Sequence, residues 1–459
     1  MLYRNTSNTE ETEDLEKYFQ KKAEGVYLPF SNDTFKKFDV KRGLRNDDGT
    51  GVTAGLTSVG SVKGYIMKDG VKTPVEGELR YRGYSLADIV KSCENDRRFG
   101  FEEVAYLLLL GQLPNKESLE KFSALIGKMR PLPDGFAEDM ILKAPSGNIM
   151  NKLARSVLAS YSYDPNPDDI SPSNLIRQSV ELIARLPVMA AYGYEAKKHY
   201  YDGKSLILHR PQENLSTAEN LLYMIRPDNK YTKEEAEMLD VMLMIHAEHG
   251  GGNNSAFTAR VVSSSGTDTY SAIAAAIGSL KGPRHGGANA KVMAMMANIE
   301  ENVDNWEDRD EVAQYIEKIL RKEAFDGSGL VYGMGHAIYT LSDPRAVLLK
   351  EKAQLLAERN PEFLKEYRLY NLIEELTPEV FLKIKGSNKP MCANVDLYAG
   401  FVYKMLGIPE PMYTPLFAIS RVVGWCAHRL EEVLGCSRII RPAYKWIITN
   451  KDYVDLNDR

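Results

Sequence analysis

Apolar residues recur at the three- and four-residue spacing of α-helices from about residue 85 almost to the C-terminus. Short breaks of glycine or proline separate these stretches, and neither a fixed repeat nor a long linker interrupts them. The expected helix starts carry a capping residue or an early proline: Ser85 with Asp88, Ser173, Thr232 with Glu235, Asp268, Asp343 with Pro344, and Thr414 with Pro415. The sequence therefore predicts an all-α fold.

One strand signal lies in the polar, turn-rich segment before these helices. Asp69-Gly70 stands between two short runs that favour strands, residues 65–67 and 71–73. Asp-Gly is favoured in the tight turn of a β-hairpin because its backbone angles suit that turn. We expect a small N-terminal β-hairpin.

The composition limits the classes of protein and partner that are possible. With 459 residues, of which 44% are hydrophobic and 26% charged, the chain is in the globular range and long enough for two lobes. Its formal net charge of -5 gives no global basic field, so we expect no nucleic-acid partner. The longest apolar runs are far shorter than the ~18 residues of a membrane span, so we expect no membrane partner.

The cysteines and the N-terminus bear on the compartment. Four cysteines without a CxxC pair are typical of reduced thiols. The acidic N-terminal stretch is unlike a secretory signal or an Arg-rich transit peptide. We expect a cytoplasmic protein.

Four of the seven histidines lie beside glycines between positions 246 and 336. His246 and His249 are three residues apart at the end of an apolar helix, so we expect them to share a face near a glycine-rich break. Two interpretations are open: imidazoles that stabilise a helix C-terminus, or a metal site that adds Glu248. The spacing differs from the His-Glu-x-x-His of zinc proteases, and two histidines alone do not make a site.

His285 follows Gly282-Pro283 on the turn that opens the next helix, where we expect it to be exposed beside partly positive backbone amides. Such a field lowers the pKa of imidazole, and a neutral histidine can donate a hydrogen bond to a developing enolate. The alternative is a merely solvated histidine in a glycine-rich loop.

A glycine-rich loop over 327–336, which contains Gly333 and Gly335, predicts backbone that lies against a ligand. No preceding strand supports a dinucleotide-binding fold, so we exclude that fold. Arg345 follows in the first turn of a helix capped by Asp343, and this end disfavours a cation unless an anion meets it. We therefore expect Arg345 to hold an anion.

Asp396 lies in the first turn of a helix that Asn394 can cap, and the alternative for it is favourable pairing with the helix dipole. Arg421 is a single cation inside an apolar helix, and it needs an anionic partner because an unpaired buried charge is costly. Arg441 is a further candidate. With Arg345, these arginines predict a pocket for a small, multiply charged carboxylate, since guanidinium matches carboxylate geometry. Asp396 with two histidines would make a proton-transfer set.

These segments, in this order, resemble the citrate synthase family of the si type over residues 77 to about 445. The matching motifs are Leu-Arg-Tyr-Arg-Gly-Tyr at 79–84, His-Ala-Glu-His-Gly-Gly-Gly-Asn at 246–253, Gly-Pro-Arg-His-Gly-Gly-Ala-Asn at 282–289, Gly-Met-Gly-His at 333–336, Asp-Pro-Arg at 343–345, Asn-Val-Asp at 394–396, Ser-Arg-Val-Val-Gly-Trp at 420–425 and Arg-Pro at 441–442. Any one motif is weak, but their order and spacing together are specific.

The resemblance implies that oxaloacetate condenses with acetyl-CoA and water to give citrate and CoA. It implies a fold of two helical domains, with a large domain over residues 1–284 and 391–459 and a small domain over residues 285–390. It also implies a homodimer. Acetyl-CoA is a substrate of this reaction, and the resemblance implies neither a cofactor nor a metal.

The family's functional residues carry over onto matching positions. The resemblance implies that Asp396 takes a methyl proton from acetyl-CoA, that His285 holds the enol oxygen, and that His336 protonates the ketone of oxaloacetate. The positions implied for oxaloacetate binding are His249, Arg345, Arg421 and Arg441, the last reaching the neighbouring subunit's site. Those implied for CoA binding are Lys389, Gly333, Gly335 and Arg284, while Thr340 and Ser387 stand where many relatives carry a basic side chain.

Three other functions compete with this one. A 2-methylcitrate synthase of the same family would use propionyl-CoA with the same residues. A remote alternative is a metal-dependent hydrolase built on His246, Glu248 and His249. The third is a non-catalytic family member, against which the complete set of His285, His336 and Asp396 argues.

Overall fold

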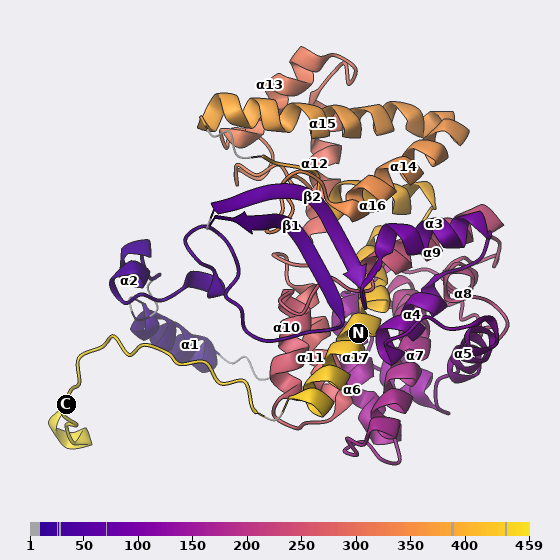
Figure 1. The fold of residues 1–459 in the computed structure, drawn as a ribbon. Coiled ribbons are helices and arrows are strands. Elements are labelled where there is room, and N and C mark those ends of the chain that lie inside the picture. Colours follow the sequence, from indigo (N-terminus) through magenta and orange to yellow (C-terminus); the bar gives the residue numbers. More distant parts are fainter. Residues whose placement is uncertain (1–9, 25, 27–28, 70, 387–389, 437) are drawn as a thin grey trace. The chain divides into compact units, whose positions relative to one another are not determined.

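The computed structural model describes residues 10–24, 26, 29–69, 71–386, 390–436 and 438–459. The chain forms two units of internal contacts, Met1–Thr53 with Arg441–Arg459, and Ala54–Ile440 (Figure 1). Every predicted site residue except Arg441 belongs to the second unit by position. The domain boundaries predicted at 284/285 and 390/391 fall inside this unit and stay predictions.

The first unit contains short elements: α1 (Glu10–Ala23), α2 (Asn32–Lys37), and 3-10 turns at Arg42–Leu44 and Leu456–Asp458. Ser31 caps α2, because its hydroxyl accepts a hydrogen bond from the N–H of Thr34 at 3.1 Å. Large apolar side chains of this unit, such as Tyr444 and Trp446, are exposed.

The second unit opens with the predicted hairpin. Strand β1 (Gly60–Lys68) pairs antiparallel with β2 (Val71–Tyr81), and the short β3 (Tyr84–Ser85) pairs with β2. The register of the β1–β2 pair shifts between Lys63 and Tyr65. The hairpin prediction is confirmed, although Gly70 of its turn lies outside the described residues.

Helices make up nearly all of the rest, as predicted. The elements before and after the 288–405 segment are α3 (Leu86–Asn95), α4 (Phe101–Leu110), α5 (Lys116–Met129), a π-helix (Ala137–Leu142), α6 (Ile149–Ala159), a 3-10 turn (Ser160–Tyr163), α7 (Pro172–Asp202), α8 (Thr217–Ile225), α9 (Lys233–His246), α10 (Asn254–Ser263), α11 (Thr269–Lys281), a 3-10 turn (Glu410–Met412) and α17 (Tyr413–Gly435). Those within it are α12 (Ala288–Asn302), α13 (Arg309–Leu320), α14 (Pro344–Arg359), α15 (Pro361–Lys385) and α16 (Val395–Met405).

The capping residues act largely as the sequence indicates. Ser85, Thr232, Asp268 and Asp343 each accept a hydrogen bond from a backbone N–H in the first turn of their helix. Two starts differ. Helix α7 begins at Pro172 behind Ser171, and α17 begins at Tyr413, because the preceding 3-10 turn runs directly into it.

Helix α17 is the buried axis of the second unit. It contacts α4, α6, α7, α9, α10 and α11, and Trp425 in its middle is fully buried. Two arginines of the same helix, Arg421 and Arg429, are also fully buried. Since apolar burial is the main favourable term in folding, a helix that buries charge at its centre needs specific partners for that charge.

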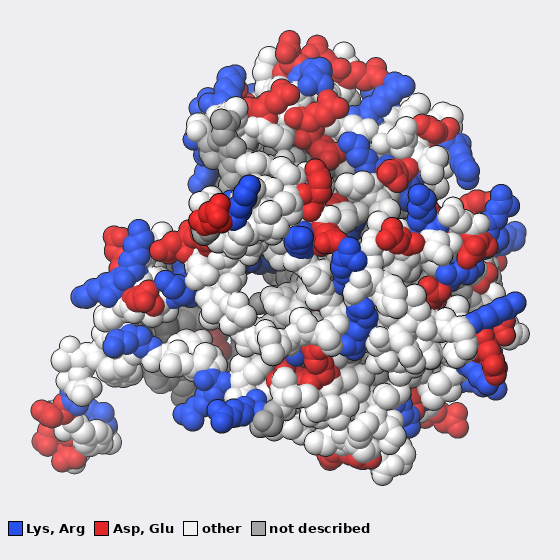
Figure 2. Space-filling model, viewed as in Figure 1, with Lys and Arg blue, Asp and Glu red and all other residues white. Residues whose placement is uncertain are grey.

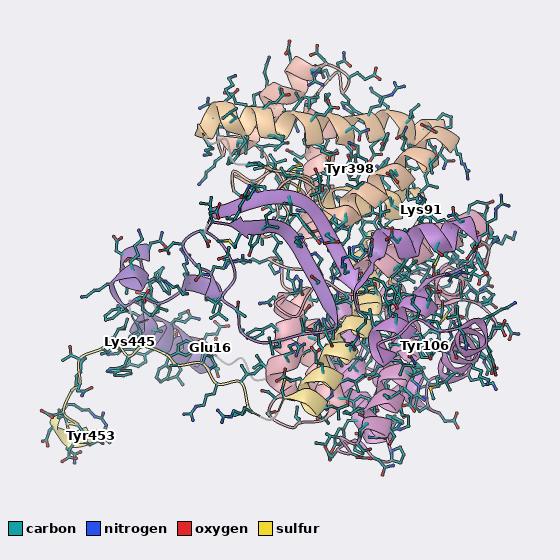
Figure 3. All side chains as sticks on the ribbon, viewed as in Figure 1. Glu16, Lys91, Tyr106, Tyr398, Lys445 and Tyr453 are labelled. Atoms are coloured by element: carbon teal, nitrogen blue, oxygen red, sulfur yellow. The ribbon has the colours of Figure 1, made fainter. Side chains whose placement is uncertain are left out.

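Helices α12 to α16 pack mostly on one another, and they lie together at the top of Figure 1. Tyr398 of α16, labelled in Figure 3, donates its hydroxyl proton toward Asn371 (2.9 Å) and Glu374 of α15. This contact fixes the helix that carries Asp396.

Acidic and basic side chains alternate over the face of the protein seen in Figure 2. Within the described part of the chain, none of the helices combines the length and the apolar character that crossing a membrane requires.

Candidate active site

Helix α9 ends at His246, so His246 and His249 do not share a helical face and that expectation is wrong. His246 turns into the core, where its Nδ1 lies 2.8 Å from Met242 O and its ring packs on Phe417. Burial lowers the pKa of His246 to about 3. The hydroxyl of Tyr81 lies 3.0 Å from Met244 O, where it caps the carbonyls that the helix end leaves unpaired.

His249 lies beyond the helix end and faces other rings. Its ring centroid is 5.3 Å from that of His336 and 5.7 Å from that of Tyr339. Its Nε2 is buried and has no hydrogen-bond partner among the residues that the structure describes. Burial, followed by the nearby Arg345, holds the pKa of His249 well below its usual range, so the imidazole is neutral.

His336 closes the predicted glycine-rich loop and is oriented by backbone. Its Nδ1 accepts hydrogen bonds from the N–H groups of Ile338 (3.0 Å) and Tyr339 (3.1 Å). In the neutral imidazole the proton is therefore on Nε2. The ring of Tyr339 stacks on His336 at 4.8 Å.

The β-hairpin lies against this loop. Gly77 N–H donates to Ser342 Oγ at 3.0 Å, and a Cβ on Gly77 would clash with the carbonyl oxygen of Ser342. A Cβ on Gly64 would likewise come within 2.6 Å of Ile338 O. Only glycine allows two strands to approach the loop so closely. The hairpin thus supports the segment between His336 and α14.

Arg345 stands in the first turn of α14, as predicted, and the anion that meets it comes from the protein. Its Nε donates to Asp343 Oδ1 at 3.0 Å and its Nη2 to Oδ2 at 2.8 Å. Asp343 Oδ1 also caps the helix by accepting Arg345 N–H. Burial opposes both charges, but their attraction raises the pKa of Arg345 and lowers that of Asp343.

Arg421 is fully buried in the middle of α17. Its Nε donates to His246 O at 2.6 Å, and its guanidinium lies 4.7 Å above the ring of Phe417. Neither Nη1 nor Nη2 has a hydrogen-bond partner within the described residues. Burial lowers the pKa of Arg421 to about 10. The side chain therefore presents two unused donor groups for an anion.

His285 is half-buried, and the expectation that it is exposed is wrong, because the turn before α12 packs against α10 and α17 through Ser255. Its Nε2 lies 3.0 Å from Ser255 Oγ, and Trp425 Nε1–H donates to the same oxygen at 3.0 Å. Burial, followed by Arg421, lowers the pKa of His285 to about 4. The expected neutral imidazole is thus favoured through burial and a cation.

Asp396 lies in the first turn of α16, which Asn394 caps as predicted. The same Asn394 joins this turn to the glycine loop, since its N–H donates to Gly333 O at 2.8 Å and its Nδ2 to Gly335 O at 2.9 Å. A Cβ on Gly333 would lie 2.9 Å from the Cα of Leu397. The turn of Asp396 and the loop of His336 therefore form one assembly.

Asp396 is a carboxylate whose pKa is raised to about 6, because burial outweighs the attraction of Arg345 and Arg421. A half-buried carboxylate whose pKa is near neutrality is a stronger base than an ordinary aspartate. Arg345 and Arg421 act electrostatically on both Asp396 and His249, which places these groups around one site. The arrangement offers one base, neutral imidazoles and two cations.

The structure does not test the roles predicted for the remaining residues. Arg284 is exposed, and the chain has positive φ at Gly333 and Gly335, +84° in both. Lys389 and Ser387 lie outside the described residues. Arg441 is exposed and belongs to the other unit of contacts. The roles of these residues stay predictions.

The metal-hydrolase alternative gains no support from the geometry. Within the described ranges, no group of three or more His, Cys, Asp or Glu side chains is positioned to hold a metal ion. Of its three residues, His246 is bonded to Met242 O and Glu248 to His428.

Several residues of the site were not recognised from the sequence as partners. Asp343 was read as a helix cap only, Ser255 and Trp425 received no role, and His428 lies outside all the motifs. The pattern Gly-Trp-Cys-Ala-His at 424–428 holds one signal, since it places a histidine two turns after Arg421 on the same helix face.

Comparison with known proteins points to one family. A family model described as the citrate synthase C-terminal domain matches residues 48–443. A citrate synthase of Haloferax volcanii is 35% identical over 375 residues, 81% of this chain and 89% of that protein. The 2-methylcitrate synthase 1 of Corynebacterium glutamicum is 32% identical over 427 residues, 92% of this chain and 98% of that protein.

A solved structure is also similar. It is the citrate synthase of Thermoplasma acidophilum in a ternary complex with carboxymethyl coenzyme A and oxaloacetate. The TM-score is 0.73 at 28% identity, and the match covers 89% of this chain and 97% of that one.

Proposed function

The chain belongs to the citrate synthase family, an enzyme family of acyl-transfer condensation, and we propose that it condenses oxaloacetate with acetyl-CoA and water to citrate and CoA. One observation carries the proposal. The half-buried carboxylate of Asp396 has a pKa near neutrality and lies in the field of two arginines, one of which also acts on the neutral His285. The ternary complex of the relative from Thermoplasma acidophilum supports the choice of oxaloacetate and a CoA thioester as substrates.

In this proposal oxaloacetate binds through its carboxylates. Arg421 offers two unused guanidinium nitrogens, Arg345 offers a cation held in place by Asp343, and His249 offers Nε2. Guanidinium groups bind carboxylates with two parallel hydrogen bonds, which fixes the orientation of the substrate. Arg441 of the partner subunit would complete the site in a homodimer.

The first chemical step is enolisation of acetyl-CoA. The carboxylate of Asp396 takes a proton from the methyl carbon while His285 donates a hydrogen bond to the thioester oxygen. When the hydroxyl proton of Ser255 points at His285 Nε2, the imidazole proton is on Nδ1, which is then the nitrogen that donates to the thioester oxygen in this proposal. A carboxylate is a weak base for a carbon acid, so proton removal depends on this stabilisation of the oxygen.

The second step forms the carbon-carbon bond. The enolate carbon attacks the ketone carbon of oxaloacetate, whose oxygen takes the proton of His336 Nε2–H. The methyl proton held by Asp396 then returns to His336, so that both groups regain their starting states. The resulting citryl thioester is then hydrolysed, so that water supplies the oxygen of the new carboxylate and CoA leaves as the thiol. No cofactor or metal takes part in these steps. The positions proposed for holding CoA are Arg284, Lys389, Gly333 and Gly335.

The acyl group is the open choice within the family. The similarity to a 2-methylcitrate synthase makes propionyl-CoA the second candidate, with the same catalytic roles. The proposed location of the enzyme is the cytoplasm.

The test measures the oxaloacetate-dependent release of CoA thiol from purified protein, with acetyl-CoA and propionyl-CoA side by side. We expect a higher kcat/KM for acetyl-CoA. Preference for propionyl-CoA would replace the proposed substrate and keep the catalytic roles, and no thiol release from either would refute the function.

A further inference from the structure

The two buried arginines of the site are neutralised in different ways. Arg345 contacts Asp343 through two hydrogen bonds. Arg421 makes no ion pair within the described residues, and its Nη1 and Nη2 have no hydrogen-bond partners there. A buried cation without a counter-charge is costly, so a carboxylate elsewhere must balance it.

Glu248 is that carboxylate. It is fully buried in the segment between α9 and α10, and among the neighbouring charged groups it acts most strongly on Arg421. Its Oε1 accepts Nε2–H of His428 at 2.9 Å and also the N–H of Gly250. Glu248 Oε1 is thus bonded to these two donors, and no ion pair joins Glu248 to Arg421 in the described part of the chain.

The donor on His428 is fixed by a further arginine. Arg260 Nη2 lies 2.8 Å from His428 Nδ1, and a guanidinium nitrogen can only donate. Nδ1 is therefore unprotonated, and Nε2 carries the proton that Glu248 accepts. Arg260 is itself paired with Glu431 and with Glu432, whose Oε2 is 2.9 Å from its Nη1. Burial opposes the charge of Glu248, but His428, the nearby Arg421 and the N–H of Gly250 lower its pKa, so the carboxylate is ionised.

The backbone leaves room for this carboxylate at two glycines. A Cβ on Gly60, at the start of β1, would lie 2.8 Å from the Cγ of Glu248. A Cβ on Gly424, one turn from Arg421 on α17, would clash with Oε2, which has no hydrogen-bond partner within the described ranges. The fold therefore accommodates a buried glutamate at this position in particular.

We propose that Glu248 is a positioning residue: a counter-charge held at a distance by His428, which balances Arg421 in the free protein without occupying the nitrogens that bind substrate. This inference rests on the proposed function, since it takes oxaloacetate as the ligand of Arg421. Glu248 makes the free protein more stable and, by repelling the dianionic substrate, makes oxaloacetate bind less tightly. Such a balance favours release of the still more highly charged citrate.

The test is Glu248→Gln, which keeps the size and the acceptor oxygen and removes the charge. We expect a lower melting temperature of the free protein, a larger rise in melting temperature on addition of oxaloacetate, and a KM for oxaloacetate about three- to tenfold lower. The KM for acetyl-CoA stays unchanged. A purely structural role of Glu248 predicts the opposite for oxaloacetate, a higher KM and a smaller rise.

Three further variants keep the test decisive. Glu248→Asp retains the charge, so it should not lower the KM for oxaloacetate. If Glu248→Gln folds poorly, the double variant Arg421→Met/Glu248→Gln should regain stability, because both charges are then absent. Glu195→Gln is the matched control, since Glu195 is also buried, has one oxygen without a partner within the described residues, and pairs with Lys198 on α7. It should leave the effect of oxaloacetate unchanged.

The outcomes separate the two proposals. If oxaloacetate fails to raise the melting temperature of the unaltered protein, the proposed function is refuted. If it does so, but Glu248→Gln shows an equal or smaller rise, or the double variant is destabilised by the sum of the single effects, the role of Glu248 is overturned.

Discussion

The N-terminal end of α14 and the middle of α17 each present a buried arginine to the same site, but they hold it differently. At α14 the cap residue Asp343 contacts Arg345, and the β-hairpin supports the loop that leads to it. At α17 the side chain of Arg421 donates from Nε alone among the residues that the structure describes, and its counter-charge Glu248 is bonded to His428. A contact pair stabilises the fold, whereas a distant pair leaves donors for a ligand.

Asp396 lies within the field of both arginines, and its replacement should have the largest effect. Asp396→Asn should reduce kcat by at least about a hundredfold, since the base for the methyl proton is lost. The KM for oxaloacetate should change little. The variant should also melt at a higher temperature, because a raised pKa of about 6 means that burial disfavours the charged carboxylate by roughly 3 kcal/mol. Steady-state kinetics and calorimetry on the same preparation check both points.

The two arginines should respond differently to methionine, which removes the charge and keeps the length. Both variants should lose about a hundredfold or more in kcat/KM for oxaloacetate. Arg345→Met should lower the melting temperature because Asp343 is left buried and unpaired. Arg421→Met should lower it less, because burial disfavours the charge of Arg421 and because Glu248 keeps its hydrogen bond from His428. Equal losses of stability would contradict the contrast between the two regions.

The pH profile of kcat tests whether the pKa of Asp396 is near neutrality although two cations lie close to it. With a pKa of about 6, kcat should fall roughly tenfold per pH unit below pH 6 at saturating substrates. The sign for stability follows from the same shift. The folded state binds this proton more tightly than the unfolded state, so the stabilisation is complete below the ordinary aspartate pKa and is lost as the pH rises through about 6. If kcat fell only below about pH 4, the attraction of the cations would outweigh the effect of burial on the pKa of Asp396.

Removal of a contact between the hairpin and the loop before α14 should have the smallest effect. Ser342→Ala removes the acceptor for Gly77 N–H and the donor to Glu76. We expect kcat/KM for oxaloacetate to fall by about two- to fivefold, as one backbone hydrogen bond is modest in energy. Ser328→Ala, in the same loop but bonded only locally, is the matched control. An equal effect of the two changes would show that the contact with the hairpin does not support the site.

Local signals predicted much of the fold and site because they depend on neighbouring residues. Ser85, Thr232, Asp268 and Asp343 cap helices through bonds to residues two or three positions on, and such bonds are visible as sequence patterns. Asn394 caps the turn of Asp396 in the same way. Where a local signal was extended too far, the prediction failed: α9 ends at His246, so its pairing with His249 on one face does not occur.

The partners of charged groups were less predictable. The sequence indicated that Arg345 and Arg421 each need an anion. The high cost of an unpaired buried charge does not identify the residue that supplies the anion. Asp343 was within two residues and is the contact partner of Arg345. Glu248 and His428 are distant in sequence and meet only because α9 and α17 pack together.

The sequence by itself determined the helical elements, their caps, the hairpin and the order of the motifs that place the chain in its family, because each depends on short-range chemistry or on direct comparison of residues. Only the tertiary structure decided how charge is distributed around the site. Burial and the nearby charged side chains set the pKa values of Asp396, His285 and Arg421. Both arise from packing between helices that lie far apart in the chain.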